Sequence, residues 1–393
     1  MPRWSRSFCW SCASGIRRRE APCVHLGLAR SPGSEYDRDK QNDAYWLRKR
    51  DFMKIIVDAM GGDNAPVEIL KGCALAVKEY GVEIIVTGDE AQIKKAAEDN
   101  SIDMTKITVE PADGVITMED NPLSLRTEKK NSSLGKAFQL LKSGEADALV
   151  GAGNSGALIV GATIIAGRIK GINRPAFAAV FPGADGYTML LDSGANVECT
   201  PHQLEQFAVL GSVYMEKMFG ITSPRVGLAN NGTEETKGTD LYKQTHALLA
   251  NNGHINFVGN VEGRALMAGG ADVIVADGFA GNLMLKSAEG AAKFMKKELK
   301  DLFSGFAGTL AGALVLKKIK SMQKRLDVKE IGGAPILGSA KCVVKAHGNS
   351  DAKAFASAIR QARDYAASGI IEKVSAAVAQ MQAEKKAEEN ADA

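Results

Sequence analysis

Five short segments rich in glycine, aspartate and asparagine each follow an apolar run. They are residues 58–64, 151–156, 192–196, 230–232 and 277–282. In open α/β sheets, the loops at the carboxyl ends of the strands line the ligand crevice, and the helices that follow point free N–H groups at it. Each segment alone is typical of a turn or a helix cap. Five of them on one expected edge of a sheet indicate a site for a polar ligand.

The segment Gly151-Ala-Gly-Asn-Ser-Gly156 matches the G-x-G-x-x-G pattern of dinucleotide-binding proteins. That pattern also needs an acidic residue about 20 residues further on to hold the ribose. The region GRIKGINRPAFAAVF contains no acidic residue, so the sequence disfavours NAD binding. We expect Gly153, Asn154, Ser155 and Gly156 to bind a phosphate-sized anion through backbone N–H groups and polar side chains.

Two further segments offer positive charge or an imidazole. Lys345-Ala-His347-Gly348 follows an apolar stretch, and Lys237 lies between glycines and beside two acids. We expect His347 and Lys237 to stabilise charge or an oxyanion, and Lys345 to bind phosphate. The alternatives are a structural role for His347, which is usual for a lone histidine near a strand end, and a surface turn around Lys237.

Acidic and amide residues of the remaining loops are expected to shape the site. Gly61 and Gly62 let the backbone turn after the first strand, and Asp63 or Asn64 can cap the next helix. Because carboxylates are poor ligands for phosphate, we expect Asp58 and Asp63 to border the crevice and to orient lysines, amides or the loop itself. The other candidates are Asn196 for catalysis, and Asp277 and Asn282 for substrate binding.

Strands and helices must position these loops. Short apolar runs alternate with amphipathic segments along the chain, at residues 54–57, 82–86, 146–150, 187–191, 255–258 and 273–276. Continuous apolar strands are typical of a parallel sheet covered by helices on both faces. The sequence therefore predicts a doubly wound, mostly parallel α/β fold.

Composition divides the 393 residues into three parts. Residues 1–52 hold all three tryptophans and a surplus of five positive charges, whereas the whole chain has a formal charge of +3. The rest therefore carries about −2, which argues against nucleic-acid binding. We interpret residues 1–52 as an atypical N-terminal extension or, alternatively, a targeting peptide. Residues 53–380 are interpreted as the α/β domain, and residues 381–393 as a polar tail.

An apolar stretch over residues 303–316 is followed by a basic segment. Fourteen residues are too few to span a bilayer. We expect residues 286–330 to form a helical arm that packs in a dimer or lies on an anionic membrane surface. The expected contact residues are Phe306, Leu310, Leu314, Lys317 and Lys318.

The order of the motifs resembles that of one family. The motifs are MKIIVDAMGGDNAP from Met53, GNSGA from Gly153, DSGAN from Asp192, GTEETKG from Gly232, DGFAGN from Asp277, GGAPILG from Gly332 and KAHG from Lys345. Together they resemble the bacterial phosphate acyltransferase family, PlsX, from about residue 53 to 369. Thr127 and Glu128 depart from the family, which tends to be more basic in that loop.

This resemblance implies a fold like that of isocitrate/isopropylmalate dehydrogenases and phosphotransacetylase. It implies a cytoplasmic homodimer, peripherally associated with membranes, that transfers a long-chain acyl group from acyl carrier protein (acyl-ACP) to inorganic phosphate. The acyl phosphate would go to a membrane glycerol-3-phosphate acyltransferase (PlsY-type) in phospholipid biosynthesis. No metal and no organic cofactor are implied. The alternatives are an NAD(P)-dependent dehydrogenase of the same fold and a non-catalytic membrane-surface scaffold.

Overall fold

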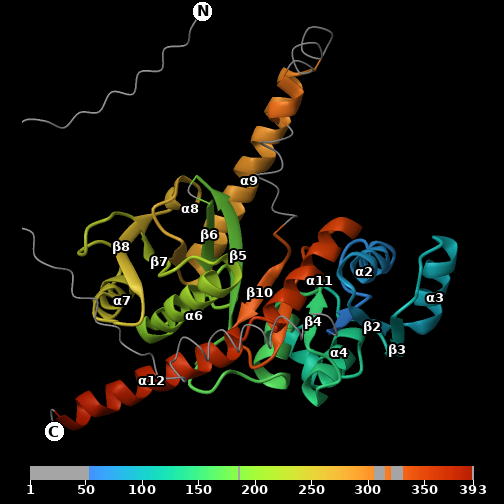
Figure 1. Cartoon of the computed structure of the whole chain (residues 1–393), viewed down its shortest axis with the longest axis horizontal. Coiled ribbons are helices and arrows are strands. Elements are labelled where there is room, and N and C mark those ends of the chain that lie inside the picture. The colour runs from blue at the N-terminus through green and yellow to red at the C-terminus, as the bar shows by residue number, and fades with distance from the viewer. Residues whose placement is uncertain (1–52, 185, 305–314, 320–330, 392–393) are drawn as a thin grey trace, which may run out of the picture. The chain divides into compact units, whose positions relative to one another are not determined.

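The computed structural model describes residues 53–184, 186–304, 315–319 and 331–391. The expectations for residues 1–52 lie outside this range. The described part contains an 11-stranded sheet with the strand order β3-β2-β1-β4-β11-β10-β5-β6-β9-β7-β8 (Figure 1). Mostly parallel pairing with helices on both faces confirms the predicted α/β fold.

Five parallel strands form the first half of the sheet. They are β1 (Lys54–Asp58), β2 (Glu83–Gly88), β3 (Ile107–Pro111), β4 (Ala148–Gly151) and β11 (Cys342–Lys345). Their helices are α2 (Val67–Tyr80), α3 (Glu90–Asp99), η2 (Pro122–Arg126), α4 (Ser133–Ser143), α5 (Ser155–Val160), η3 (Gly161–Ile165) and α11 (Ala352–Ala366). Side chains of β1 alternate between two layers: Ile55 and Val57 pack with α2 and α11, whereas Ile56 packs with α4.

Four parallel strands form the second half. They are β6 (Gly186–Leu191), β9 (Val273–Val275), β7 (Arg225–Asn230) and β8 (Asn256–Glu262). The helices of this half are α6 (Pro201–Phe219), α7 (Asp240–Ala250), α8 (Ala265–Ala268), α9 (Gly278–Leu302) and α12 (Ile370–Ala391). Leu191 packs with α6 on one face, and Leu190 packs with α8 and α9 on the other.

The strands β10 (Ala334–Leu337) and β5 (Ala176–Gly183) join the two halves. The pairs β11/β10, β10/β5 and β5/β6 are all antiparallel. Because three reversals in a row invert the strand direction, the second half runs opposite to the first. We call the carboxyl ends of β1, β4 and β11 the first edge, and those of β6, β9 and β7 the opposite edge.

The expectation that all five glycine-rich loops share one edge was therefore wrong. Loops 58–64 and 151–156 lie at the first edge, and loops 192–196, 230–232 and 277–282 lie at the opposite edge. Two of the reversals join strands that follow one another in sequence: β5 and β6 pair up to Gly183 and Gly186, and β10 pairs with β11. The sequence analysis did not include these antiparallel pairs.

Helix α9 is buried only at its start. Its first three turns pack against β6 and β9, whereas from Gly290 to Leu302 nearly every residue is exposed, and this part extends beyond the sheet (Figure 1). Lys317 and Lys318 are exposed in a short helical segment. The expected contacts at Phe306, Leu310 and Leu314 lie outside the described residues. Among the helices that the structure describes, none has the length and hydropathy to cross a bilayer.

Candidate functional site at the first edge

The loops after β1 and β4 meet backbone to backbone at the first edge. A methyl group on Gly61 would stand 2.6 Å from Asp58 Oδ2 and 3.0 Å from the Cα of Gly153. A methyl group on Gly153 would stand 3.2 Å from the Cα of Gly61. Both positions therefore need glycine because another backbone approaches closely, and not only because the chain turns.

Asp58 lies buried directly beneath this contact. Burial raises the pKa of its carboxyl group, while the nearby polar groups of Ser133, Met60 and Gly61 act in the opposite direction. The Met60 N–H donates to Asp58 Oδ1 at 3.2 Å. The Asp58 side chain thus holds the backbone of its own loop.

A third loop, after β11, joins the same surface. The Asp63 N–H donates to the Gly348 carbonyl at 2.8 Å, and the Ala346 N–H donates to the Gly151 carbonyl at 2.9 Å. The expected cap of α2 by Asp63 or Asn64 was wrong. The Asn64 side chain instead donates to the Ser350 carbonyl at 3.3 Å, and no side chain caps α2. Asn64 thus ties the β1 loop to the β11 loop.

Asn154 and its neighbours order the loop after β4. The Asn154 Oδ1 accepts from the Ala157 N–H at 3.0 Å and caps α5, while its amide nitrogen donates to the Thr117 carbonyl at 2.9 Å. Gly156 packs on Pro122, where a methyl group would stand 2.6 Å from Cγ. The Asn154 side chain therefore has structural partners on both sides, and the ligand-facing groups left in this loop are Ser155 and backbone N–H groups.

Helix α9 crosses from the opposite edge to the first edge. The pairing of β11 with β10, β5, β6 and β9 gives the relative heights of their residues along the strand direction. By this register, Val275 lies one residue closer to the opposite edge than Lys345 does. Asp277, which caps α9, lies two residues further toward the opposite edge, so it is roughly 10 Å from the level of Lys345 along the strand direction. The nine residues from Asp277 to Lys286 rise about 13 Å. Lys286 therefore reaches the level of Lys345.

Positive groups gather where α9 passes the β11 loop. Burial, followed by the charge of Lys286, lowers the pKa of Lys345, while Glu289 opposes the shift. Burial, followed by Lys345, lowers the pKa of His347; Lys286 and Lys293 lower it further, and Glu289 opposes them. Lys286 Nζ lies 2.9 Å from Glu289 Oε2. Because like charges disfavour one another's charged forms, this cluster favours an anionic ligand.

The opposite edge is organised around the buried carboxylate of Asp192. Burial raises its pKa, against the hydrogen bonds that it accepts. The donors are the N–H groups of Phe177, Gly194, Ala195 and Asn196 and the side-chain amide of Asn196. The Asn196 amide also donates to the Pro175 carbonyl at 2.9 Å. Asp192 and Asn196 therefore bind backbone of their own surroundings.

The start of α9 is pinned to this cluster. Asp277 accepts from the Ala280 N–H at 2.8 Å and from the Tyr242 hydroxyl at 2.7 Å. A methyl group on Gly281 would stand 1.8 Å from the Asp192 carbonyl oxygen. Asn282 is exposed and lies against Gly194. The polar residues of the opposite edge thus anchor a helix whose later turns reach the first edge.

The structure divides the residues proposed from the sequence into two groups. At the first edge it brings together Asp58, Asp63, Gly153, Asn154, Ser155, Gly156, Lys345 and His347. The other group, at the opposite edge, is Asn196, Lys237, Asp277 and Asn282. Lys237 follows β7 at the opposite edge, whereas His347 follows β11 at the first edge, so the structure does not bring the two together. Sequence reasoning missed Lys286, Glu289 and Lys293, whose only signal is a spacing of three and four residues that places them on one helical face.

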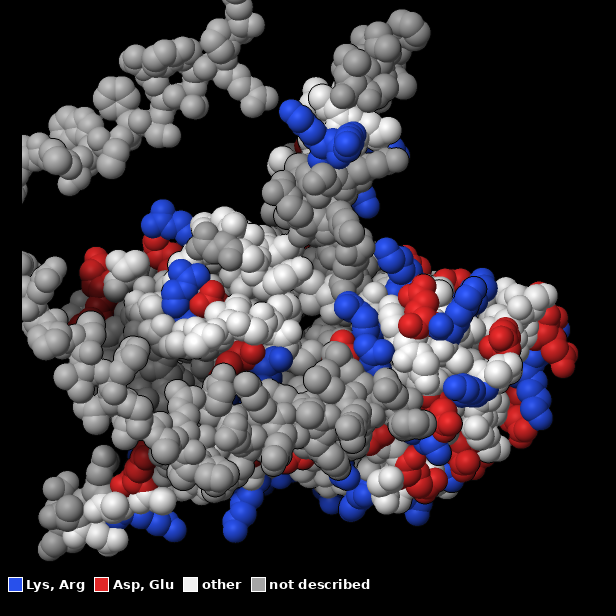
Figure 2. Space-filling model, viewed as in Figure 1, with Lys and Arg blue, Asp and Glu red and all other residues white. Residues whose placement is uncertain are grey.

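The charged surface is mixed rather than uniformly basic. Figure 2 shows Lys and Arg interspersed with Asp and Glu on the visible face, with lysines gathered on the extending part of α9. Within the described ranges, no three His, Cys, Asp or Glu side chains converge in a metal-binding group. The first edge can hold an anion between glycine-rich backbone and lysines, which is suited to binding a phosphate beside an electrophile.

Comparisons with known proteins agree with this chemistry. A family model described as "Fatty acid synthesis protein" matches residues 53–373. A phosphate acyltransferase of Clostridium novyi is 45% identical over 330 residues, which are 84% of this chain and 99% of that protein. A phosphate acyltransferase of Pelotomaculum thermopropionicum is 47% identical over 331 residues, covering 83% of this chain and 95% of the relative.

Solved structures share the fold at low sequence identity. A phosphotransacetylase from Streptococcus pyogenes superposes with a TM-score of 0.55 at 16% identity, covering 83% of this chain and 98% of that one. The EutD phosphotransacetylase of Staphylococcus aureus superposes with a TM-score of 0.52 at 16% identity, covering 84% of this chain and 98% of that one. These matches show that the chain shares its overall fold with these two structures.

Proposed function

Because the chain belongs to the phosphate acyltransferase family, we propose that it transfers a long-chain acyl group from acyl-ACP to inorganic phosphate. The chain is an acyltransferase of lipid synthesis. The observation that carries the finer proposal is the gathering of Lys345, His347, Lys286 and Lys293 beside the glycine-rich loops of the first edge. The products are acyl phosphate and the free thiol of the carrier.

Lysines and backbone hold the acceptor in this proposal. Lys345 and Lys286 neutralise two phosphate oxygens, and Glu289 positions Lys286 through their ion pair. Backbone N–H groups from Gly153 to Gly156, with the Ser155 hydroxyl, bind the remaining oxygens. Binding phosphate beside the thioester converts a bimolecular encounter into a reaction within one complex.

His347 stabilises the oxyanion that forms on the thioester. The Asn349 N–H points at His347 Nδ1 at 3.4 Å, so the neutral ring carries its proton on Nε2. A phosphate oxygen attacks the carbonyl carbon, the carbonyl oxygen becomes negative, and Nε2–H donates to it. The C–S bond then breaks, and the thiolate leaves with the electron pair. Because the conjugate thiol has a pKa of about 8.5, the thiolate can leave without help from a strong acid, and it is later protonated by water.

The assembly and location are part of the same proposal. We propose a homodimer in the cytoplasm that touches the membrane surface and passes acyl phosphate to a PlsY-type glycerol-3-phosphate acyltransferase. Support comes from α9, where Phe294 and Leu302 are 61% and 69% exposed. Large apolar side chains exposed on one helix favour contact with a second chain or with lipid.

The central test uses the purified full-length protein with palmitoyl-ACP and inorganic phosphate. Acyl phosphate, trapped as a hydroxamate, is expected in amounts that depend on both substrates. If no hydroxamate forms with long-chain acyl-ACP, the proposed donor is wrong. A substrate-dependent change in NAD(P)H absorbance would instead support a dehydrogenase.

A further inference from the structure

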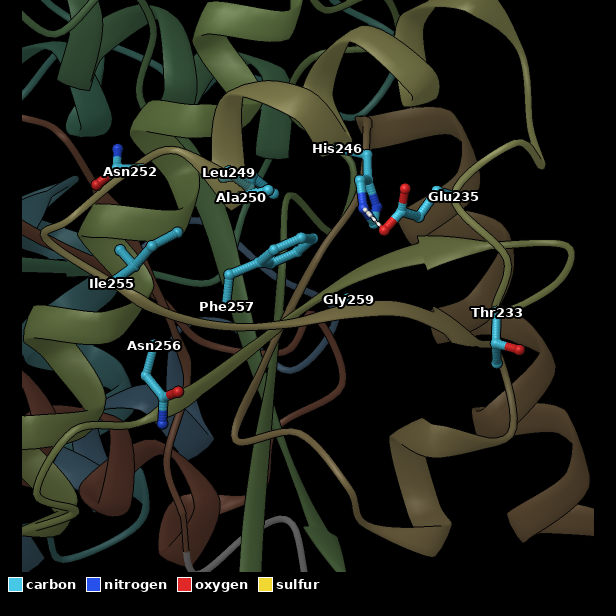
Figure 3. A pocket seen from close by; sticks show the side chains of 10 residues that line it. All are labelled: Thr233, Glu235, His246, Leu249, Ala250, Asn252, Ile255, Asn256, Phe257 and Gly259. Atoms are coloured by element: carbon cyan, nitrogen blue, oxygen red, sulfur yellow. Dashed lines mark ion pairs between the residues drawn. The ribbon is translucent and has the colours of Figure 1, made fainter.

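A hollow of about 470 Å³ lies at the outer margin of the second half, between α7 and the edge strand β8 (Figure 3). Leu249, Ile255 and Phe257 form its apolar part, and the rest of the lining is mainly polar: Thr233, Glu235, His246, Asn252 and Asn256. None of the residues that line it belongs to the loops of the first edge. It is therefore separate from the proposed reaction site.

The protonation pattern of His246 follows from its neighbours. The amide nitrogen of Asn260 donates to the Glu234 carbonyl at 2.8 Å, so the Asn260 Oδ1 is the atom that faces His246. That oxygen lies 3.0 Å from Nδ1, which must donate to it. In the neutral ring, Nε2 is then an acceptor. It lies 3.8 Å from Glu235 Oε1, and the two side chains stand side by side (Figure 3).

Two acceptors at this spacing suit a single ammonium nitrogen. Hydrogen bonds of about 2.9 Å to both atoms would meet at the nitrogen at an angle of roughly 80°. The N–H bonds of an ammonium group diverge by about 109°, so each hydrogen bond bends by only about 15°, which leaves it well aligned. Glu235 supplies the negative charge, and His246 supplies a fixed lone pair.

The rest of the hollow indicates the body of the ligand. The Phe257 ring lies edge-on to His246, with centroids 5.1 Å apart, and closes the floor beneath the acceptors. No Lys or Arg is among the lining residues, so carboxylates and phosphates would find no countercharge there.

We propose that this hollow is a second binding site, for an organic cation with an ammonium group on an apolar body. The ammonium group bridges Glu235 and His246, and the apolar body covers Phe257, Leu249 and Ile255. Asn260 links His246 to the backbone of Glu234, so the bound cation also holds the loop that follows β7. The proposal is independent of the acyl transfer proposed above.

Benzylamine is the probe, because it joins an ammonium group to an aromatic ring. Titrated into the ¹⁵N-labelled full-length protein near pH 8, it should shift the His246 ring signals with a Kd on the order of 1 mM. The spectrum of His246→Gln identifies those signals. Benzyl alcohol should bind at least about 10-fold more weakly, and benzoate should cause no shift. Equal shifts from all three compounds, or none from benzylamine, would overturn the proposal.

Matched carboxylate variants separate binding from a general charge effect. Glu235→Gln should weaken benzylamine binding about 3-fold, because it removes a countercharge that is 85% exposed to solvent. Glu83→Gln changes an exposed carboxylate of β2, in the other half of the sheet, and should leave the Kd unchanged. Equal Kd values for the two variants would show that the bridge is absent. Equal thermal midpoints are the check that both variants fold.

Discussion

At the opposite edge, Asp192, Asn196 and Asp277 direct their polar atoms at nearby backbone and at one another. At the first edge, the side chain of Lys345 has no hydrogen bond or ion pair within the described residues, and His347 is partly buried but still open to solvent. A satisfied buried cluster fixes local structure, whereas a cluster of like charges is completed by an anion. Similar loops thus fix local structure at one edge, and at the other they border the site that we propose binds phosphate.

The largest expected effect tests the anchoring role of the opposite edge. In Gly281→Ala, the added methyl group would overlap the Asp192 carbonyl oxygen, 1.8 Å away, and should lower the free energy of unfolding by roughly 3 kcal/mol. Gly290→Ala is the control on the same helix, where a methyl group meets open space, and it should be neutral or stabilise by up to about 1 kcal/mol. Denaturant melts measure both. An unchanged denaturation midpoint for Gly281→Ala would show that the close contact between Gly281 and Asp192 does not anchor α9.

Two variants that each remove one lysine charge test which edge takes part in the reaction. Lys345→Gln removes a half-buried charge at the first edge and should lower kcat/KM for phosphate by about 10- to 100-fold. Lys237→Gln removes an exposed charge at the opposite edge and should change it by less than about 2-fold. Steady-state hydroxamate assays give both values. A larger loss for Lys237→Gln would reverse the assignment of the edges.

Two lysines of α9 sharpen the comparison further. Lys286→Gln should raise the KM for phosphate about 10-fold, because the side chain lies at the level of Lys345. Lys300 lies fourteen residues later, about 21 Å along the helix, so Lys300→Gln should leave the KM unchanged. If both variants behave alike, the charge of the whole helix matters and not its passage beside the β11 loop.

The smallest expected effect is a change in titration. Neighbouring positive charge contributes to the lowered pKa of His347, so Lys345→Gln should raise this pKa. Glu289 acts in the opposite sense, and Glu289→Gln should lower it further. Histidine ring NMR over a pH series measures both directions. Shifts of the same sign in the two variants would contradict the cluster.

Much of the fold could be predicted from local pattern. The run 54–57 and the segment from Pro66 to Tyr80 correspond to β1 and α2. The reversal between β10 and β5 could not be predicted, because the paired residues are more than 150 apart, whereas the β5/β6 and β10/β11 reversals join strands close in sequence and were missed. The site was predictable only in part for the same reason. The glycines at 61 and 153 mark turns in the sequence, but their mutual contact exists only once β1 and β4 are neighbours.

Individual side chains show the same limit. Asn154 has the residue type of a phosphate ligand, yet the carbonyl of Thr117 and the N–H of Ala157 engage its side chain. In the sequence, Lys286 cannot be told from an ordinary surface lysine of a helix. Only the reversed strand order brings it to the first edge. Residue type therefore indicated the chemistry, whereas long-range pairing selected which residues can take part.

Helix α9 behaves as a lever whose pivot is the Asp192–Gly281 contact. A tilt of about 8° at the pivot would move Lys286 by roughly 1 Å and the end of the helix by roughly 4 Å, given a rise of about 1.5 Å per residue. Displacements of about 1 Å at a reacting centre can change rates by about 10²-fold. A force on the far end of α9 would therefore be felt at the first edge as a smaller movement of Lys286.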